Sequence, residues 1–311
     1  MTHRLNPVAS LQHVTRTFAE VTALKDISLD LMSGELIGML GPNGAGKSTL
    51  LQLISGLRRP TSGKVELFGQ DPRLPGARLQ LGTTPQETGL PATLKVREVV
   101  DFVAGHYPDP MTRDEVLSRF GISALQHRQV GGLSGGQKRR LAVALSLVGR
   151  PRLVLLDEPT TGLDIDARHI LWDAVREYHA SGACVVVTSH YLEEIQALAE
   201  RVVVIDSGRV LADEGLSTVL QKVDVRQVRL RLDPADQGVS ASLECLDGVL
   251  SVEPGEVHTL VTRDADATVR ALVRAGVRFS GIEVHGASLE EAFLTLTRHT
   301  PVPNLTMGDD R

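Results

Sequence analysis

The segment GPNGAGKST, residues 41–49, is the feature that most restricts the fold of this chain. It fits the pattern G-x-x-x-x-G-K-[ST] and stands between an apolar stretch, residues 35–40, and a stretch with helical spacing, residues 47–55. A strand that passes through a glycine-rich turn into a helix is typical of α/β architecture with a mostly parallel sheet. The glycines leave backbone N–H groups bare, and the helix presents its N-terminus to the same place. The segment therefore predicts a phosphate-binding loop.

The positions of this loop have separate expected tasks. Lys47 should reach the β- and γ-phosphates of a nucleotide, and Ser48 should ligate Mg²⁺. The backbone of the other positions should surround the phosphate oxygens. The candidate binding residues are Gly41, Pro42, Asn43, Gly44, Ala45, Gly46, Lys47, Ser48 and Thr49.

Two acidic residues follow a second apolar run. Leu153–Leu156 leads directly into Asp157 and Glu158. Open α/β sheets bind ligands at the carboxyl ends of their strands, and successive residues of a strand point in opposite directions. We therefore expect Asp157 to bind Mg²⁺ and Glu158 to face the attacking water. The alternative, two solvated carboxylates at a strand end, is disfavoured by the upstream phosphate loop.

A third motif, LSGGQ at residues 133–137, opens a further helix. Ser134 can cap that helix, and Gly135 and Gly136 leave N–H groups bare, which makes a second anion site. Alone, the motif indicates an ordinary capped helix equally well. Its place after the phosphate loop and before Asp157 favours nucleotide binding. The candidate residues are Ser134, Gly135, Gly136 and Gln137.

With these ordered motifs, the chain resembles the ATP-binding subunits of ABC transporters over residues 5 to about 220. The resemblance implies a P-loop NTPase fold, with ATP and Mg²⁺ as ligands and a helical subdomain inserted at about residues 88–150. It also implies that two subunits pack head to tail, so that each ATP lies between the phosphate loop of one subunit and the LSGGQ motif of the other. A homodimer is the simpler interpretation, because this chain carries every motif of a competent site.

The resemblance implies roles for four more residues. Phe18 matches the aromatic position that stacks on adenine; the family more often has Tyr there, and a core Phe is the alternative. Gln86 matches the glutamine that senses Mg²⁺ and links to the membrane subunit. Asp164 matches the D-loop, and His190 the switch histidine on the γ-phosphate. The expected catalytic residues are thus Glu158, His190 and Gln86, and the expected Mg²⁺ ligands are Ser48, Gln86 and Asp157.

Two further segments, TSHYLEE at residues 188–194 and SLEEAFL at residues 288–294, are similar to one branch of the family. This is the drug- and polyether-exporter branch of ABC-2 type, whose members are daunorubicin-resistance-like. The resemblance implies a separately encoded membrane permease as partner, and the helix-rich residues 93–130 are expected to dock it. Two alternatives stay open. One is an importer ATPase, which often carries a longer β-barrel-like domain. The other is a soluble ABC protein of translation or DNA repair, which usually has tandem halves or coiled-coil insertions.

The pattern of strands and helices changes near residue 222, where a second domain over residues 222–299 is expected. The order of its elements, β-α-β-β-α-β, is the split βαβ pattern of ferredoxin-like domains. The expected elements are strand 225–232, helix 239–247, strands 249–253 and 257–262, helix 266–275 and strand 277–285. A last helix at residues 288–298 opens with a capping-box signature, and residues 300–311 form a tail. Cys245, His258 and His285 are scattered and indicate no ligand site.

Charge and apolar content limit the choice of partners and compartment. A net charge of −5 and a pI of about 6.1 argue against broad binding of nucleic acid. Residues 138–140, KRR, are interpreted as a solvated helix face. No apolar run approaches the roughly 18 residues of a membrane-spanning helix. With Cys184 interpreted as a buried apolar residue and no signal peptide recognised, we expect a cytoplasmic protein, peripheral on the inner face of the cell membrane.

Overall fold

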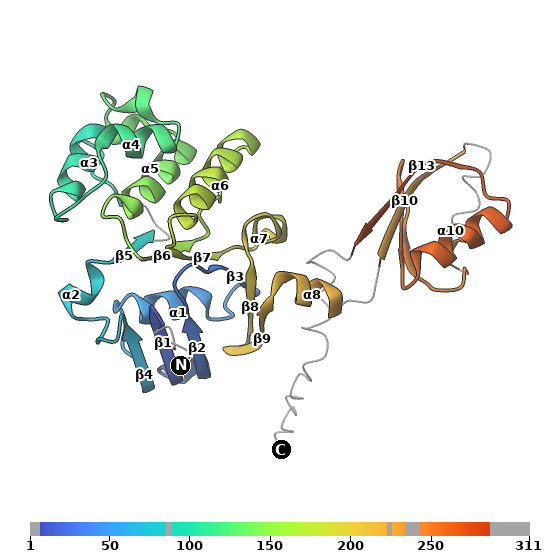
Figure 1. The fold of residues 1–311 in the computed structure, drawn as a ribbon, viewed down its shortest axis with the longest axis horizontal. Coiled ribbons are helices and arrows are strands. Elements are labelled where there is room, and N and C mark those ends of the chain that lie inside the picture. Colours follow the sequence, from blue (N-terminus) through green and yellow to red (C-terminus); the bar gives the residue numbers. More distant parts are fainter. Residues whose placement is uncertain (1–6, 85–88, 223–225, 234–242, 245, 287–311) are drawn as a thin grey trace, which may run out of the picture. The chain divides into compact units, whose positions relative to one another are not determined.

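The computed structural model describes residues 7–84, 89–222, 226–233, 243–244 and 246–286. The chain divides into two compact units, Met1–Leu216 and Ser217–Arg311. In the described residues, the first unit holds a six-stranded and a three-stranded sheet, and the second unit holds a four-stranded sheet (Figure 1).

The central sheet of the first unit has the strand order β5-β6-β7-β3-β8-β9. The strands are β5 (Leu81–Thr84), β6 (Leu153–Asp157), β7 (Cys184–Thr188), β3 (Leu36–Leu40), β8 (Arg201–Asp206) and β9 (Arg209–Gly215). All neighbouring pairs are parallel except β8 and β9. Every residue of β3, β6 and β7 is buried, because both faces of a parallel sheet are covered, and this explains their continuous apolar runs. The carboxyl ends of these strands lie at one edge of the sheet.

A smaller antiparallel sheet of order β2-β1-β4 packs on the other side of helix α1 (Lys47–Ile54), which lies between the two sheets (Figure 1). Its strands are β1 (Ala9–Phe18), β2 (Val21–Leu31) and β4 (Ser62–Leu67). Val14 of β1, Leu50 and Leu53 of α1, and Leu155 of β6 belong to one buried apolar cluster. This shared core fixes the start of α1 against the central sheet.

Between β5 and β6 the chain is helical. The elements are α3 (Val96–Ala104), α4 (Arg113–Arg119), η1 (Ser123–Leu125), η2 (Val130–Gly132) and α5 (Gly135–Leu147). Helices α3, α4 and α5 contact one another, and α5 also contacts β5 and β6 (Figure 1). The remaining helices of the first unit are α2 (Pro75–Arg78), α6 (Ile165–His179) and α7 (Leu192–Leu198), and α8 (Leu216–Lys222) begins at its last residue. None of the helices in the described ranges is both long and apolar enough to cross a membrane.

The second unit contains an antiparallel sheet of order β11-β12-β10-β13. Its elements are β10 (Arg226–Leu232), β11 (Val249–Glu253), β12 (His258–Thr262), α10 (Ala265–Arg274) and β13 (Phe279–Gly286). Alternate residues of β10 pack with α10 in a core of their own that includes Val228, Leu230 and Leu272. The expected helix at residues 239–247 lies mostly outside the described residues, and the expected helix at 288–298 and the tail at 300–311 lie wholly outside them. The ferredoxin-like class of this domain stays a prediction.

Candidate functional site

The turn between β3 and α1 is shaped so that its backbone can approach an anion. A Cβ atom at Gly41 would overlap with the carbonyl oxygen of Ile205, and one at Gly46 would lie 2.7 Å from the carbonyl oxygen of Ala23. Gly46 also has a φ of 110°, which side chains rarely allow. No side chain caps α1, so the N–H groups of its first turn are left for a ligand. These residues fit a phosphate group at the place that the sequence predicts.

Lys47 folds back over this turn. Its ammonium group is buried and donates to the carbonyl oxygens of Gly41 (2.5 Å) and Pro42 (3.1 Å). Burial lowers the pKa of Lys47, and the negative charges of Glu158 and Asp157 oppose that shift. The Lys47 ammonium is thus held inside the turn by carbonyl oxygens of its own loop.

Asp157 and Ser48 line the same small cavity, of about 130 Å³, between α1 and the ends of β5 and β6. The carboxylate of Asp157 accepts a hydrogen bond from the hydroxyl of Thr188 (2.5 Å), and its backbone N–H donates to the hydroxyl of Thr84 (3.2 Å). A carboxylate and a hydroxyl are hard oxygen ligands, and Mg²⁺ usually takes only one or two protein ligands beside phosphates. The described residues hold no cluster of three His, Cys, Asp or Glu side chains for a metal. Gln86 lies outside the described residues.

Glu158 and His190 are brought together. A carboxylate oxygen of Glu158 lies 3.4 Å from Nδ1 of His190, and the other accepts from the hydroxyl of Thr161 at 3.3 Å. Glu158 has a left-handed backbone, with φ of 48°, which is uncommon for a residue other than glycine. Its N–H group donates to the backbone carbonyl (3.1 Å) and the hydroxyl (3.0 Å) of Thr188. The side chain of Glu158 is thus directed by a backbone that its neighbours hold in place.

The interpretation of residues 138–140 as a solvated face was wrong for Arg139. This side chain is only 8% exposed, and its guanidinium donates to the carbonyl oxygens of Asp157, Glu158 (2.6 Å) and Pro159 (3.3 Å). Burial lowers the pKa of Arg139. The signal that could have found it is helical spacing, because Arg139 stands three and four residues before the buried Ala142 and Val143.

The LSGGQ segment begins α5 with a capping box. The hydroxyl of Ser134 accepts from the N–H of Gln137 (3.2 Å), and the side chain of Gln137 accepts from the N–H of Ser134 (3.0 Å). Ser134 and Gly135 are exposed, whereas Gly136 is partly buried, and a Cβ on Gly136 would lie 3.1 Å from Leu163. Asp164, directly after Leu163, caps α6 by accepting from the N–H of Ala167 (2.8 Å). The motif and the segment of Asp164 therefore lie near each other on an accessible surface.

Phe18 ends β1 and is half-buried, outside the buried apolar clusters described above. The guanidinium of Arg16 lies 4.4 Å from the centre of its ring, and that of Arg58 lies 5.0 Å from it. The location does not favour a core Phe. Stacking on adenine stays a prediction.

Sequence reasoning also missed Glu194, a fully buried carboxylate in α7. It accepts hydrogen bonds from the hydroxyl of Thr160 (2.9 Å) and the indole N–H of Trp172 (3.2 Å). Burial raises the pKa of Glu194, and hydrogen bonds from Ser189, Thr160 and Trp172 oppose that shift. The Glu194 side chain thus connects three parts of the first unit, namely the segment after Glu158, helix α6 and the residue before His190.

Replacing Glu194 with Ala should destabilise the first unit by more than about 2 kcal/mol, because it leaves buried donors without an acceptor at about 1–3 kcal/mol each. The shift would be measured by urea unfolding followed by circular dichroism. Glu193→Ala is the matched control, since the Glu193 side chain is 82% exposed and its replacement should change stability little. Equal midpoints for the two variants would contradict the role given to Glu194.

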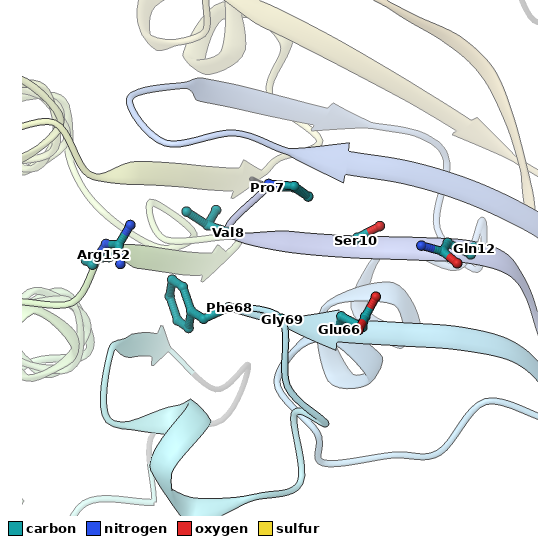
Figure 2. Close-up of a pocket in the computed structure, with 8 residues that line it drawn as sticks. All are labelled: Pro7, Val8, Ser10, Gln12, Glu66, Phe68, Gly69 and Arg152. Carbon is teal, nitrogen blue, oxygen red and sulfur yellow. The ribbon is translucent and has the colours of Figure 1, made fainter. Parts of the chain in front are cut away.

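A cavity of about 560 Å³ lies elsewhere in the first unit (Figure 2). The residues that line it come from β1, the end of β4 and the amino end of β6: Pro7, Val8, Ser10, Gln12, Glu66, Phe68, Gly69 and Arg152. Arg152 directly precedes β6, whereas Asp157 ends it, so the cavity lies away from the carboxyl edge of the sheet. It is separate from the cavity that Ser48 and Asp157 line.

Comparisons with known proteins find related sequences and structures. Residues 24–161 match the family model described as ABC transporter. A Streptomyces coeruleorubidus protein, daunorubicin resistance ATP-binding protein DrrA3, is 34% identical over 308 residues, covering 95% of this chain and 94% of that protein. Nod factor export ATP-binding protein I of Rhizobium johnstonii is 35% identical over 303 residues, covering 94% and 96%. A solved dimeric ATP-binding cassette, in a post-hydrolysis state bound to ADP and Pi, is similar with a TM-score of 0.61 and 27% identity. That similarity covers 67% of this chain and 98% of the solved chain.

Proposed function

Since this chain belongs to the family of ABC transporter ATP-binding proteins, we propose that it is the ATP-binding and ATP-hydrolysing subunit of an exporter, which drives transport through a separately encoded membrane permease. The relatives named for daunorubicin resistance and for Nod factor export support the direction of transport. The observation that carries the proposal is that Ser48 of the phosphate loop and Asp157 at the end of β6 line one cavity at the carboxyl edge of the sheet.

Binding of ATP begins at the phosphate loop. The N–H groups of residues 43–49 and the ammonium of Lys47 bind the β- and γ-phosphates, which take the place of the loop carbonyl oxygens that Lys47 contacts. Phe18 supplies a ring for the adenine. Ser48, Asp157 and Gln86 would hold Mg²⁺, which would supply positive charge against the phosphates.

The hydrolytic step is assigned to Glu158 and His190. Glu158 orients the attacking water and accepts its proton, and the fixed backbone on both sides of Glu158 keeps the carboxylate aimed. His190, within 3.4 Å of that carboxylate, contacts the γ-phosphate and holds its position relative to Glu158. Gln86 completes the set of catalytic residues.

Two copies of the chain pack head to tail around two ATP molecules. Ser134, Gly135, Gly136 and Gln137 bind the nucleotide held by the partner, and Asp164 lies beside them at the interface. The charge of each ATP is shared between two helix N-termini on different chains, so ATP favours the closed dimer, and hydrolysis removes that preference. The dimeric solved relative with ADP and Pi supports this arrangement.

The permease is expected to dock on residues 93–130 of the helical subdomain. Phe102 of α3 lies in this segment and is 67% exposed. Docking would place the protein on the inner face of the cell membrane. The division into an ATPase domain at residues 5–220 and a C-terminal domain at residues 222–299 is part of the same proposal.

The proposal is tested by purifying a tagged copy of the chain from detergent-solubilised membranes and identifying what accompanies it by mass spectrometry. A protein with several membrane-spanning helices should be recovered, and the complex should hydrolyse ATP. Recovery of ribosomal or DNA-repair proteins with no membrane protein would contradict the role in transport. An untagged strain treated in the same way is the control.

A further inference from the structure

One buried side chain connects two motifs that the proposed function places in different ATP sites. Arg139 belongs to α5, whose first turn carries the LSGGQ motif. Its guanidinium donates to the successive carbonyl oxygens of Asp157, Glu158 and Pro159. The helix that begins at Ser134 is thereby attached to the segment that carries the catalytic carboxylate.

The segment that Arg139 holds has an unusual conformation. Glu158 is left-handed, with φ of 48°, a conformation that residues other than glycine rarely adopt. On its amino side, the N–H of Glu158 is held by Thr188, and on its carboxyl side its carbonyl oxygen is held by Arg139 at 2.6 Å. With both neighbouring peptide groups fixed, the direction in which the Glu158 side chain leaves the backbone is fixed too.

The chemistry of arginine suits this task better than that of lysine. A guanidinium is planar and carries five donors, so it can bind three carbonyl oxygens at once, whereas an ammonium is a point charge. Burying the guanidinium is costly, and burial lowers the pKa of Arg139. Its neighbour Arg140 donates to the carbonyl oxygens of Phe120 (3.2 Å) and Gly121 (3.4 Å). Arg140 thus provides a matched comparison on the same helix.

We propose that Arg139 is a positioning residue that holds Glu158 of its own ATP site and, through the first turns of α5, ties it to the Ser134 turn that binds the partner's ATP. The inference rests on the proposed head-to-tail dimer. In that dimer Glu158 acts on the nucleotide of its own chain, while Ser134 contacts the other nucleotide. A displacement of α5 by one ATP is therefore transmitted to the carboxylate that hydrolyses the other.

The first test compares steady-state ATP hydrolysis of Arg139→Lys, Arg139→Met and the control Arg140→Met in the full chain. Both Arg139 variants should lose about tenfold or more in kcat, the scale of a small misplacement of a catalytic group, with KM for ATP nearly unchanged. Arg140→Met should keep kcat within about threefold. An equal loss in kcat for Arg139→Lys and Arg140→Met, or a loss that appears in KM alone, would overturn the positioning role. Arg139→Lys keeps the charge and the helix propensity, so a folded variant is available.

The second test uses mixed dimers, in which a limiting amount of a hydrolysing chain is combined with an excess of Glu158→Gln chain. The reference is a limiting amount of wild-type chain in the same excess of Glu158→Gln chain. In the first arm, the limiting chain carries Arg139→Met. In the second arm, the limiting chain is wild type, and the excess chain carries both Arg139→Met and Glu158→Gln. The excess chain then contributes only its LSGGQ motif to the site that hydrolyses ATP. Hydrolysis is measured per limiting chain.

Both arms should fall below the reference, the first by about tenfold and the second by about threefold or more, as for coupling between sites. A loss in the first arm alone would overturn the connection between the two sites. Failure of the proposed function would be seen separately. Without ATPase activity, wild-type protein would hydrolyse ATP in no mixture, and without a role in transport, no membrane protein would accompany the tagged chain.

Discussion

Glu158→Gln should lower ATP turnover by about 10²–10⁴-fold while ATP still binds, the usual loss when a general base is removed. An amide of the same size cannot accept the proton of the attacking water. The contacts that hold the backbone here are made by Thr188 and Arg139 to main-chain atoms, so the substitution leaves them in place. Turnover would be measured as phosphate release and ATP binding by calorimetry.

Glu193→Gln provides the control for that experiment. Glu193 carries the same chemical change in an exposed carboxylate of α7, four residues along the chain from the Ser189 that contacts Glu194. The Glu193→Gln variant should retain the ATP turnover of the wild type. If Glu158→Gln hydrolyses ATP at nearly the rate of wild type, Glu158 has no place in the mechanism.

The second large effect is expected for Ser134→Arg in the Glu158→Gln background, which should no longer form a dimer with ATP. Ser134 is exposed at the N-terminus of α5, where the head-to-tail arrangement requires close contact with the partner's nucleotide. An arginine fills that space with a long side chain. The state of association would be measured by size-exclusion chromatography with and without ATP.

Ser134→Ala separates this obstruction from the loss of the helix cap. Either variant removes the hydrogen bond from the N–H of Gln137, at a cost of about 1 kcal/mol. Only the arginine adds bulk, so the alanine variant should still dimerise with ATP. A Ser134→Arg, Glu158→Gln double variant that elutes as a dimer in ATP would show that the head-to-tail model is wrong for this chain.

The fold of the nucleotide site could be predicted because its motifs combine chemistry with position. The glycines, Lys47 and Ser48 stand after an apolar strand, and Asp157 and Glu158 end another, so parallel pairing brings both groups to one edge. The family match confirms the fold class and the ATP-binding family. The separate roles of these residues stay predictions.

The burial of the charged residues Arg139 and Glu194 was not predicted from the sequence. Arg139 stands in a run of three basic residues, and such runs usually face solvent. Glu194 follows another glutamate, and nothing local distinguishes the two, although one is fully buried and the other is 82% exposed. Their partners are backbone carbonyl oxygens and side chains distant in the sequence, which no local pattern identifies.

The order of the strands in the sheet of the second unit also depends on contacts between distant parts of the sequence. The expected strands of the second unit lie within a few residues of β10, β11, β12 and β13, because alternation of apolar residues is a local signal. Their order in the sheet depends on pairing between distant segments, such as Val228 of β10 with Leu260 and Val284. Only the structure provides that order.

The buried indole that donates to Glu194 has a practical consequence. Trp172 is the single tryptophan of the chain, and it is buried in α6 with its N–H directed at that carboxylate. All tryptophan emission of the protein therefore originates from one point, joined through Glu194 to the segment that ends at His190. A movement of that segment when nucleotide enters or leaves changes the surroundings of this fluorophore, so the cycle of the enzyme can be followed in time without any added label.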